Sequence, residues 1–216
     1  MFKPSIQGGG VVPLTANYED YYDNETNQSS YSTTMNIGTA AVGRRVVVCV
    51  ADCGNNANQY VTGVNINGSA ADLHIAQNDS GGDSCVAIAS MVVESGTTAT
   101  VEAVLNAAAD RLGMHTIAIY GSSEIDNTAG DNASPLTQSI GVSDGGVLIG
   151  ATQNNSVATW TWTNLTEQAD EAVGTGGSSS SVAFDDEMAA STVEVTSEPT
   201  ALGANYGMAL ASFRPV

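Results

Sequence analysis

Two histidines, His74 and His115, are the side chains of this chain best suited to act as a general base. Strand alternation places His115 on the same face as the apolar Ile117 and Ile119, so we expect a buried ring and not an accessible base. Two Gly-Ser-Ser runs occur, but neither has the strand–serine–helix context of a serine-hydrolase nucleophile. The sequence therefore predicts no catalytic residue and a protein that is not an enzyme.

Carboxylates are the next candidates, because they can cleave glycosides in pairs or hold a cation. The densest acidic run, Asp185-Asp186-Glu187, precedes a strand and is typical of a solvated hairpin edge, where charge discourages aggregation. The segments 79–83 and 126–131 place aspartates on turns, but neither has the spacing of an EF-hand loop. We interpret both as ordinary Asp/Gly turns, with a bound calcium ion as the alternative. The sequence thus predicts no metal and no cofactor.

Trp160 and Trp162 lie two residues apart on an expected strand and share one face. An exposed aromatic pair on a sheet would stack sugars, whereas a buried pair would belong to the core or to a subunit interface. These are the two tryptophans of the chain, and we favour the core or an interface.

The cysteines do not form a disulfide framework. Cys49 lies within the apolar run 46–50 and is expected to be a small core residue. Three residues separate Cys49 from Cys53, which fits neither a redox motif nor a zinc site. A disulfide between Cys53 and Cys85 is left as an alternative.

The chain has 216 residues, with 23 acidic and 5 basic side chains and a formal net charge of -18. A nucleic-acid-binding protein needs a basic surface to displace counterions from phosphate, and an anionic membrane would repel this chain. No apolar run reaches the roughly 18 residues of a spanning helix. The N-terminal segment lacks the apolar core of a signal peptide. We therefore expect no nucleic-acid binding, no membrane attachment and no secretory route.

The composition indicates an all-β protein. Charged residues make up 13% of the chain, and Ser, Thr, Asn and 23 glycines supply the polar surface. Val, Ile and Thr are plentiful and fit pleated sheets. The best helix candidate, of one or two turns, is 103–111. Strands are expected at 44–51, 60–65, 71–77, 85–93, 97–105, 114–120, 136–142, 146–152, 158–162, 181–188, 191–197 and 206–213.

These strands fall into two series with similar order and spacing. The runs 46–48, 61–64, 86–89, 100–103 and 115–120 correspond in order to 147–149, 158–162, 182–184, 192–195 and 207–213. The pattern predicts two pseudo-repeated antiparallel β-sandwich halves, as separate sandwiches or as parts of a large one. We expect an extended N-terminal arm over 1–35, half one over 36–123, a connector over 124–135 and half two over 136–216.

Four segments carry a resemblance to a known family. They are Gly-Arg-Arg-Val-Val-Val (43–48), the hairpin 61–68, Ala-Thr-Trp-Thr-Trp-Thr (158–163) and Ala-Leu-Ala-Ser-Phe (209–213). In these segments the chain resembles virion structural proteins of tailed bacteriophages, and its opening 2–10 is similar to that of small phage structural proteins. The resemblance implies a β-sandwich head decoration or cement protein, made in the host cytoplasm and located on the capsid surface of the virion.

The same resemblance implies protein partners. These would be the major capsid protein or other virion proteins, in a homo-oligomer or symmetric array on the particle. In this hypothesis the N-terminal arm binds neighbouring subunits, and the alternative is that it packs on its own body. The expected interface residues are Phe2, Lys3, Ile6, Val11, Val12, Leu14, Tyr18, Tyr21 and Tyr22.

The competing function is a carbohydrate-binding module or a component of a tail-spike or tail-fibre adhesin. It would use Trp160 and Trp162 together with acidic loops. The two functions differ in whether these tryptophans face solvent.

Overall fold

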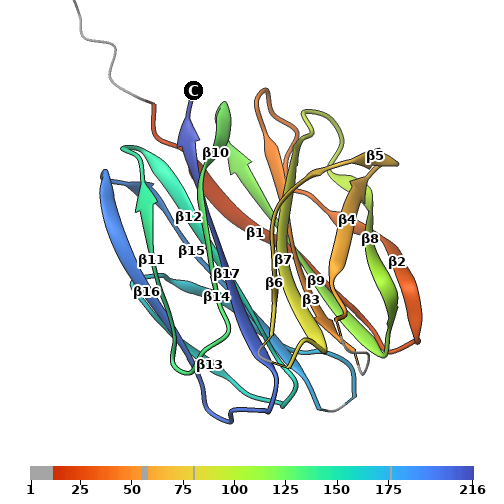
Figure 1. Cartoon of the computed structure of the whole chain (residues 1–216). Helices are drawn as coiled ribbons and strands as arrows, with labels where there is room; N and C mark the ends of the chain where they lie inside the picture. The colour runs from red at the N-terminus through yellow and green to blue at the C-terminus, as the bar shows by residue number, and fades with distance from the viewer. Residues whose placement is uncertain (1–11, 55–57, 80, 176) are drawn as a thin grey trace, which may run out of the picture.

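A computed structural model describes residues 12–54, 58–79, 81–175 and 177–216 (Figure 1). The regular elements of these ranges are β-strands in antiparallel ladders, which confirms the all-β prediction. In half one they are β1 (Thr15–Asn24), β2 (Gln28–Asn36), β3 (Arg45–Cys53), β4 (Val61–Ile66), β5 (Ser69–Ala70), β6 (Asp72–Asn78), β7 (Ser84–Val92), β8 (Thr98–Ala109) and β9 (Arg111–Tyr120). In half two they are β10 (Ser123–Asp131), β11 (Leu136–Val142), β12 (Gly146–Asn154), β13 (Trp160–Thr163), β14 (Glu167–Ala172), β15 (Ser179–Met188), β16 (Ser191–Pro199) and β17 (Tyr206–Pro215).

Each half is a two-sheet sandwich, and the strand order is the same apart from β5, which has no counterpart among the described residues of half two. In half one the larger sheet runs β1-β9-β3-β7-β6 and the smaller sheet runs β2-β8-β4-β5. In half two the orders are β10-β17-β12-β15-β14 and β11-β16-β13. The nested pairs β1–β9, β2–β8 and β3–β7 are those of a jelly roll. The predicted repeat is confirmed, because every pair of matched runs falls on equivalent strands: β3 and β12, β4 and β13, β7 and β15, β8 and β16, β9 and β17.

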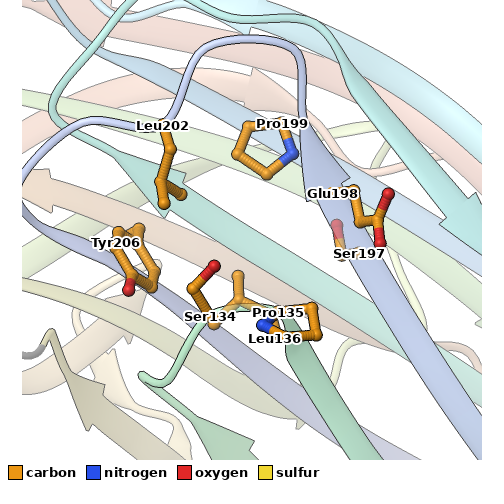
Figure 2. Close-up of a pocket in the computed structure, with 8 residues that line it drawn as sticks. All are labelled: Ser134, Pro135, Leu136, Ser197, Glu198, Pro199, Leu202 and Tyr206. Atoms are coloured by element: carbon orange, nitrogen blue, oxygen red, sulfur yellow. The ribbon is translucent and has the colours of Figure 1, made fainter.

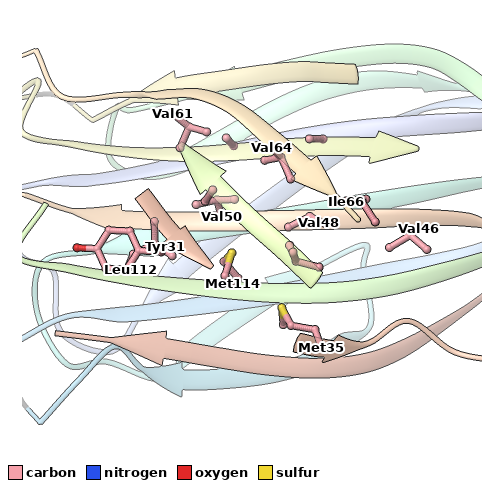
Figure 3. Close-up of a cluster of buried hydrophobic side chains, with 14 of the residues drawn as sticks. Tyr31, Met35, Val46, Val48, Val50, Val61, Val64, Ile66, Leu112 and Met114 are labelled. Carbon is pink, nitrogen blue, oxygen red and sulfur yellow. The ribbon is translucent and has the colours of Figure 1, made fainter. Parts of the chain in front are cut away.

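The four sheets stack as smaller, larger, larger, smaller, with three hydrophobic layers between them. The first-half core lies between the two sheets of half one and includes Val48, Val64 and Met114 (Figure 3). The second-half core lies between the two sheets of half two and includes Leu148 and Leu210. The central core joins the larger sheets and consists of Leu14, Ala16, Val47, Cys49, Val86, Ile88, Ile117, Ile119, Val147, Ile149, Ala151, Val182, Phe184, Ala209, Ala211 and Phe213.

Strand alternation explains why the larger sheets are apolar on both faces. Along β3, Val46 and Val48 face the first-half core, whereas Val47 and Cys49 face the central core. A strand that is buried on both faces has a continuous run of apolar residues, as 46–50 and 147–151 do. The equivalent sheets meet through equivalent faces, so the halves are related by an approximate two-fold axis.

The predicted arm and connector differ from the structure. Residues 15–24 and 28–36 form β1 and β2, which pair with β9 and β8 inside half one. Residues 123–131, placed mostly in the connector, form β10 at the edge of the other larger sheet. β1 and β10 occupy equivalent positions, and each has a register shift, at Tyr18/Asp20 and at Ile125/Asn127. A bulge adds a residue and breaks the period of two, so neither sequence shows clean alternation.

The helix candidate 103–111 is wrong. Residues 98–109 form β8, in which alternate side chains from Ala99 to Leu105 are buried in the first-half core. Ala is a good helix former, but packing against β2 and β4 overrides this weak preference.

The shared central core predicts that the two halves unfold as one unit. Ile88 is fully buried in this layer and belongs to half one, whereas both tryptophans belong to half two. We expect Ile88→Ala to lower the free energy of unfolding by about 2–5 kcal/mol. Urea titration followed by tryptophan fluorescence should therefore shift to a lower midpoint although the substitution is in the other half.

Val92→Ala is the matched control, because Val92 lies on the same strand but is 44% exposed. It should change the free energy of unfolding by no more than about 0.5 kcal/mol. An unchanged fluorescence midpoint for Ile88→Ala, with a shift seen only by circular dichroism, would show that the halves unfold independently.

Candidate functional sites

His115 lies between the two halves and not at an accessible site. It projects from β9, and its side chain is 1% exposed. Its Nδ1 is 3.1 Å from the Tyr18 hydroxyl and its Nε2 is 2.9 Å from Oγ of Ser180, which belongs to half two. Burial lowers the pKa of His115 to about 3. The ring is therefore neutral at physiological pH, as part of a polar contact between the halves.

Two tyrosines of β1 surround this histidine. The rings of Tyr21 and His115 are 4.8 Å apart, and the Tyr21 hydroxyl donates a hydrogen bond of 2.9 Å to the Ala172 carbonyl oxygen. Burial, supplemented by nearby carboxylates that include Glu171, raises the pKa of both Tyr18 and Tyr21. Both phenols stay protonated, and they connect β1 with half two.

The second histidine belongs to a cluster around Arg45. His74 is half-buried, and its Nε2 is 2.7 Å from Oγ of Ser90. Arg45 donates to the same hydroxyl and to the Ser123 hydroxyl and carbonyl oxygen. Burial, together with the charge of Arg45, lowers the pKa of His74. The cluster crosses from half one to half two, which gives it a structural role.

Arg44 is a fully buried cation held by neutral groups. It is 0% exposed, and its guanidinium donates four hydrogen bonds of 2.6–3.0 Å to backbone carbonyl oxygens. Those carbonyl oxygens belong to Gly38, Val93, Ser95 and Gly96. The side chain thereby closes the two loops that flank the start of β3.

One motif was missed in the sequence. The segment 141–145 has the Gly-x-Ser-x-Gly spacing of a hydrolase elbow. Ser143, however, lies in the tight turn between β11 and β12, and its Oγ donates to Asp126 at 2.8 Å. A strand–turn–strand connection lacks the helix that the elbow requires, so the match carries no hydrolase function.

The acidic run 185–187 caps backbone groups. Asp186 accepts a hydrogen bond of 2.8 Å from the Ala16 amide, and Asp185 accepts one of 3.2 Å from the Thr166 amide. Glu187 is exposed and has a positive φ of 51°. Asp185 and Asp186 thus connect the end of β15 to the Thr166 amide and to the start of β1, in agreement with a structural role for the run.

Both tryptophans face the second-half core, as favoured from the sequence. Trp160 is 4% exposed, and Trp162 packs partly buried against the same cluster. The Trp162 indole donates a hydrogen bond of 2.9 Å to Oγ of Ser181. Its ring occupies the space beside Gly150, where an added Cβ would approach it to 2.6 Å. The pair therefore does not form an exposed platform for sugars.

A pocket of about 220 Å³ lies at one end of the second-half sandwich (Figure 2). Figure 2 shows Leu202 and Tyr206 on one side of it and Pro135 and Leu136 on the other. Its volume is below the range of about 300–1,000 Å³ of typical small-molecule sites. Its lining contains one ionisable carboxylate, Glu198, and does not form a catalytic arrangement.

The two segments proposed as cation sites differ from each other, and 126–131 lies in strand β10 and not on a turn. Asp131 has both carboxylate oxygens bonded, to the amides of Asn132, Ala133 and Thr137. In Asp79, Oδ1 accepts from the amides of residues 81–83. Local backbone amides thus satisfy both carboxylate oxygens of Asp131 but only one of those of Asp79. The other, the buried Oδ2 of Asp79, has no hydrogen-bond partner within the described part of the chain.

A buried carboxylate missed in the sequence lies near Asp79. Asp52 is 0% exposed, and among the described residues neither of its carboxylate oxygens has a hydrogen-bond partner. Burial, with a further contribution from Asp79, raises the pKa of Asp52. Alternation from Val46, Val48 and Val50 already points Asp52 inward, so the sequence contained a signal for it. In the ranges that the structure describes, no group of three or more His, Cys, Asp or Glu forms a metal cluster.

Cys49 and Cys85 are buried free thiols. Cys49 lies in the central core, as expected, and Cys85 lies in the first-half core. Burial raises the pKa of both thiols to about 12. Because Cys85 is a free thiol, the alternative of a Cys53–Cys85 disulfide is wrong.

The expected interface residues fall into three groups. Phe2, Lys3, Ile6 and Val11 lie outside the described residues. Val12 is 77% exposed, whereas Leu14 is 1% exposed and belongs to the central core. The tyrosines belong to β1: Tyr18 and Tyr21 contact His115, and Tyr22 packs against the first-half core. Leu14 and the tyrosines are thus used in the fold, and only Val12 of the described members is free for a partner.

Comparison with models of known protein families and with functionally characterised proteins finds no match for this chain. Across the described ranges, no helix has the length and apolar character needed to cross a membrane.

The burial of His115 predicts a pH-dependent stability. The unfolded chain takes up a proton near pH 6.5, whereas the folded chain does so only near pH 3, so folded stability is lost as the pH falls below 6.5. We expect protonation of this single group in the unfolded chain to lower the free energy of unfolding by about 2 kcal/mol between pH 7.5 and pH 5.0. Urea titrations of wild type and His115→Gln at both pH values measure it.

The carboxylates titrate in both proteins, so their contribution cancels when the loss of unfolding free energy of the variant is subtracted from that of wild type. The variant should lose about 2 kcal/mol less than wild type over this range. Equal losses in the two proteins would mean that His115 accepts a proton in the folded state.

Proposed function

We propose that this chain is a non-enzymatic structural component of a bacteriophage particle, which decorates or cements the capsid by binding neighbouring shell subunits. The observation that carries the proposal is the pair of jelly rolls joined through their larger sheets, with both histidines hydrogen-bonded and Cys49 and Cys85 buried inside the fold. Jelly rolls form viral shell proteins but also lectins, so the fold alone does not decide. The resemblance of segments 43–48, 158–163 and 209–213 to phage virion proteins favours the first.

The charge distribution supports a role on an exposed surface. Arg44 and Arg45 are buried, so two of the five basic side chains do not contribute to the surface. Asp52 and Asp79 are buried as well, so the accessible surface keeps the acidic excess of the whole chain. Such a surface stays soluble at high local concentration and repels the phosphates of a packaged genome.

The structure of the N-terminal region supports a short attachment segment at the start of the chain. The Leu14 amide donates a hydrogen bond of 2.8 Å to the Gly145 carbonyl oxygen, and the Leu14 side chain is buried between the halves. The chain is thus fixed to its own body from Leu14 onward. We assign the attachment to residues 2–12, which include Phe2, Lys3, Ile6, Val11 and Val12.

The sugar-binding alternative lacks the feature on which it was based. Trp160 is buried and Trp162 packs partly buried against the second-half core, so the pair does not present two exposed rings on a sheet face. We therefore do not propose this function.

The attachment proposal predicts the effect of a short deletion. Phage that lacks the gene for this chain would be grown in cells that supply either wild type or a variant without residues 2–12. We expect the deletion variant to keep its melting temperature but to be missing from purified virions, whereas wild type is incorporated in many copies per head. Gel electrophoresis and immunogold labelling of the particles measure both.

Val157→Asp is the control, because Val157 is 53% exposed but lies outside the proposed segment. It should be incorporated like wild type. Absence of wild type from purified virions, or normal incorporation of the deletion variant, would contradict the proposal. A longer deletion of residues 2–30 is unsuitable because it removes β1 and part of β2.

Repulsion between the acidic surfaces predicts the salt dependence of attachment. Salt screens this repulsion, so incorporation of the purified chain into depleted particles should increase between about 50 and 500 mM NaCl. Attachment that weakens steeply over the same range would instead indicate that the chain binds a basic partner surface.

A further inference from the structure

The end of half one that holds Asp52 has a surplus of buried oxygen atoms. Four side-chain oxygens there have no hydrogen-bond partner among the described residues: both carboxylate oxygens of Asp52, Oδ2 of Asp79 and Oε1 of Gln59. Asp52 and Gln59 are 0% exposed and Asp79 is 4% exposed. Buried acceptors without donors are costly, and oxygens are the ligands of hard cations.

Backbone pairing brings these three residues to one corner. Asp52 lies opposite Cys85 on β7, and the Asp79 amide bonds to the carbonyl oxygen of Ser84, the residue before it. The Gln59 amide donates a hydrogen bond of 3.0 Å to the Gly82 carbonyl oxygen, within the turn that Asp79 organises. The end of β3 and the turn between β6 and β7 therefore lie against each other.

The side chain of Gln59 has a fixed orientation over this corner. Its Nε2 is directed to the Ala107 carbonyl oxygen at 3.4 Å. Its Oε1 lies over Gly54, so close that a Cβ on that glycine would fall 1.4 Å away. Gly54 is two residues after Asp52, so Oε1 faces the end of β3 that bears this carboxylate.

Half two provides an internal comparison. Asn154 occupies the position of Asp52, because Asp52 lies opposite Cys85 at the start of β7 and Asn154 lies opposite Ser179 at the start of the equivalent strand β15. Val173 occupies the position of Asp79, since its amide bonds to the Ser178 carbonyl oxygen as that of Asp79 bonds to Ser84. The same fold thus forms with neutral side chains at both places, and the two carboxylates are a specific property of half one.

We propose that Asp52, Gln59 and Asp79 bind a divalent cation with the preferences of Ca²⁺. Calcium accepts carboxylate, amide and backbone carbonyl oxygens together with water, in a flexible coordination shell. Two carboxylates would neutralise its charge, and Gln59 would add a neutral ligand. The ion would join the end of β3 to the turn between β6 and β7. This inference is independent of the proposed virion function.

Calorimetric titration of the EDTA-treated full chain with CaCl₂ tests the site. We expect binding of one Ca²⁺ per chain and a rise in melting temperature, with weaker binding of Mg²⁺ because it demands a more rigid octahedral shell. Asp52→Asn and Asp79→Asn should each weaken Ca²⁺ binding by at least the factor of about ten that is typical even of outer-shell partners. Asp144→Asn is the control, because it removes the same charge at an exposed position.

The dependence of stability on calcium separates this site from a protonated aspartic acid. In EDTA, Asp52→Asn should be at least as stable as wild type, because it removes a buried charge, whereas in CaCl₂ wild type should be the more stable. The proposal is overturned if wild type binds no stoichiometric Ca²⁺ at millimolar concentration. It is also overturned if Asp52→Asn and Asp79→Asn bind as tightly as Asp144→Asn.

Discussion

Burial of the two larger sheets on each other is the constraint on which this structure depends. Each jelly roll has its own core, but its larger sheet is also apolar on the outer face, with Val47, Ile88 and Ile117 exposed if the other half were absent. Such a face cannot remain in water without causing association. The approximate two-fold relation resolves this requirement, because the same kind of face occurs in both halves and each covers the other.

Polar groups that enter this central layer must find partners inside it. His115 pairs with Ser180, and Arg45 pairs with the hydroxyl and carbonyl oxygen of Ser123, so these contacts join the halves. Hydrogen bonds of this kind add little net stability, but a mispaired arrangement would leave buried groups unsatisfied. These hydrogen bonds therefore favour one alignment of the two larger sheets, whose facing surfaces are otherwise apolar. This explains why side chains with catalytic potential serve the fold here.

The sequence predicted the buried strands well and the edge strands poorly, for a physical reason. Strands buried on both faces, such as β3 and β12, are recognisable as apolar runs, and the repeat was visible in them. β1 and β10 each have a bulge and a polar outer side, so the period of two is lost and they were assigned to an arm and a connector. Among candidate sites, the burial of His115 followed from alternation, whereas the corner of Asp52 and Gln59 depends on contacts between distant loops.

The internal repeat also indicates where this chain departs from what its fold requires. Where equivalent positions agree in character, as Val47 and Ile149 do, packing accounts for both. Where they differ sharply, as Asp52 and Asn154 do, the fold tolerates either residue, and the costlier one needs another explanation. A pair of buried carboxylates is the costlier choice, because burial and mutual repulsion both oppose its charge. The second jelly roll forms without such a pair, and the cation that we propose would compensate the buried charge of the carboxylates in the first.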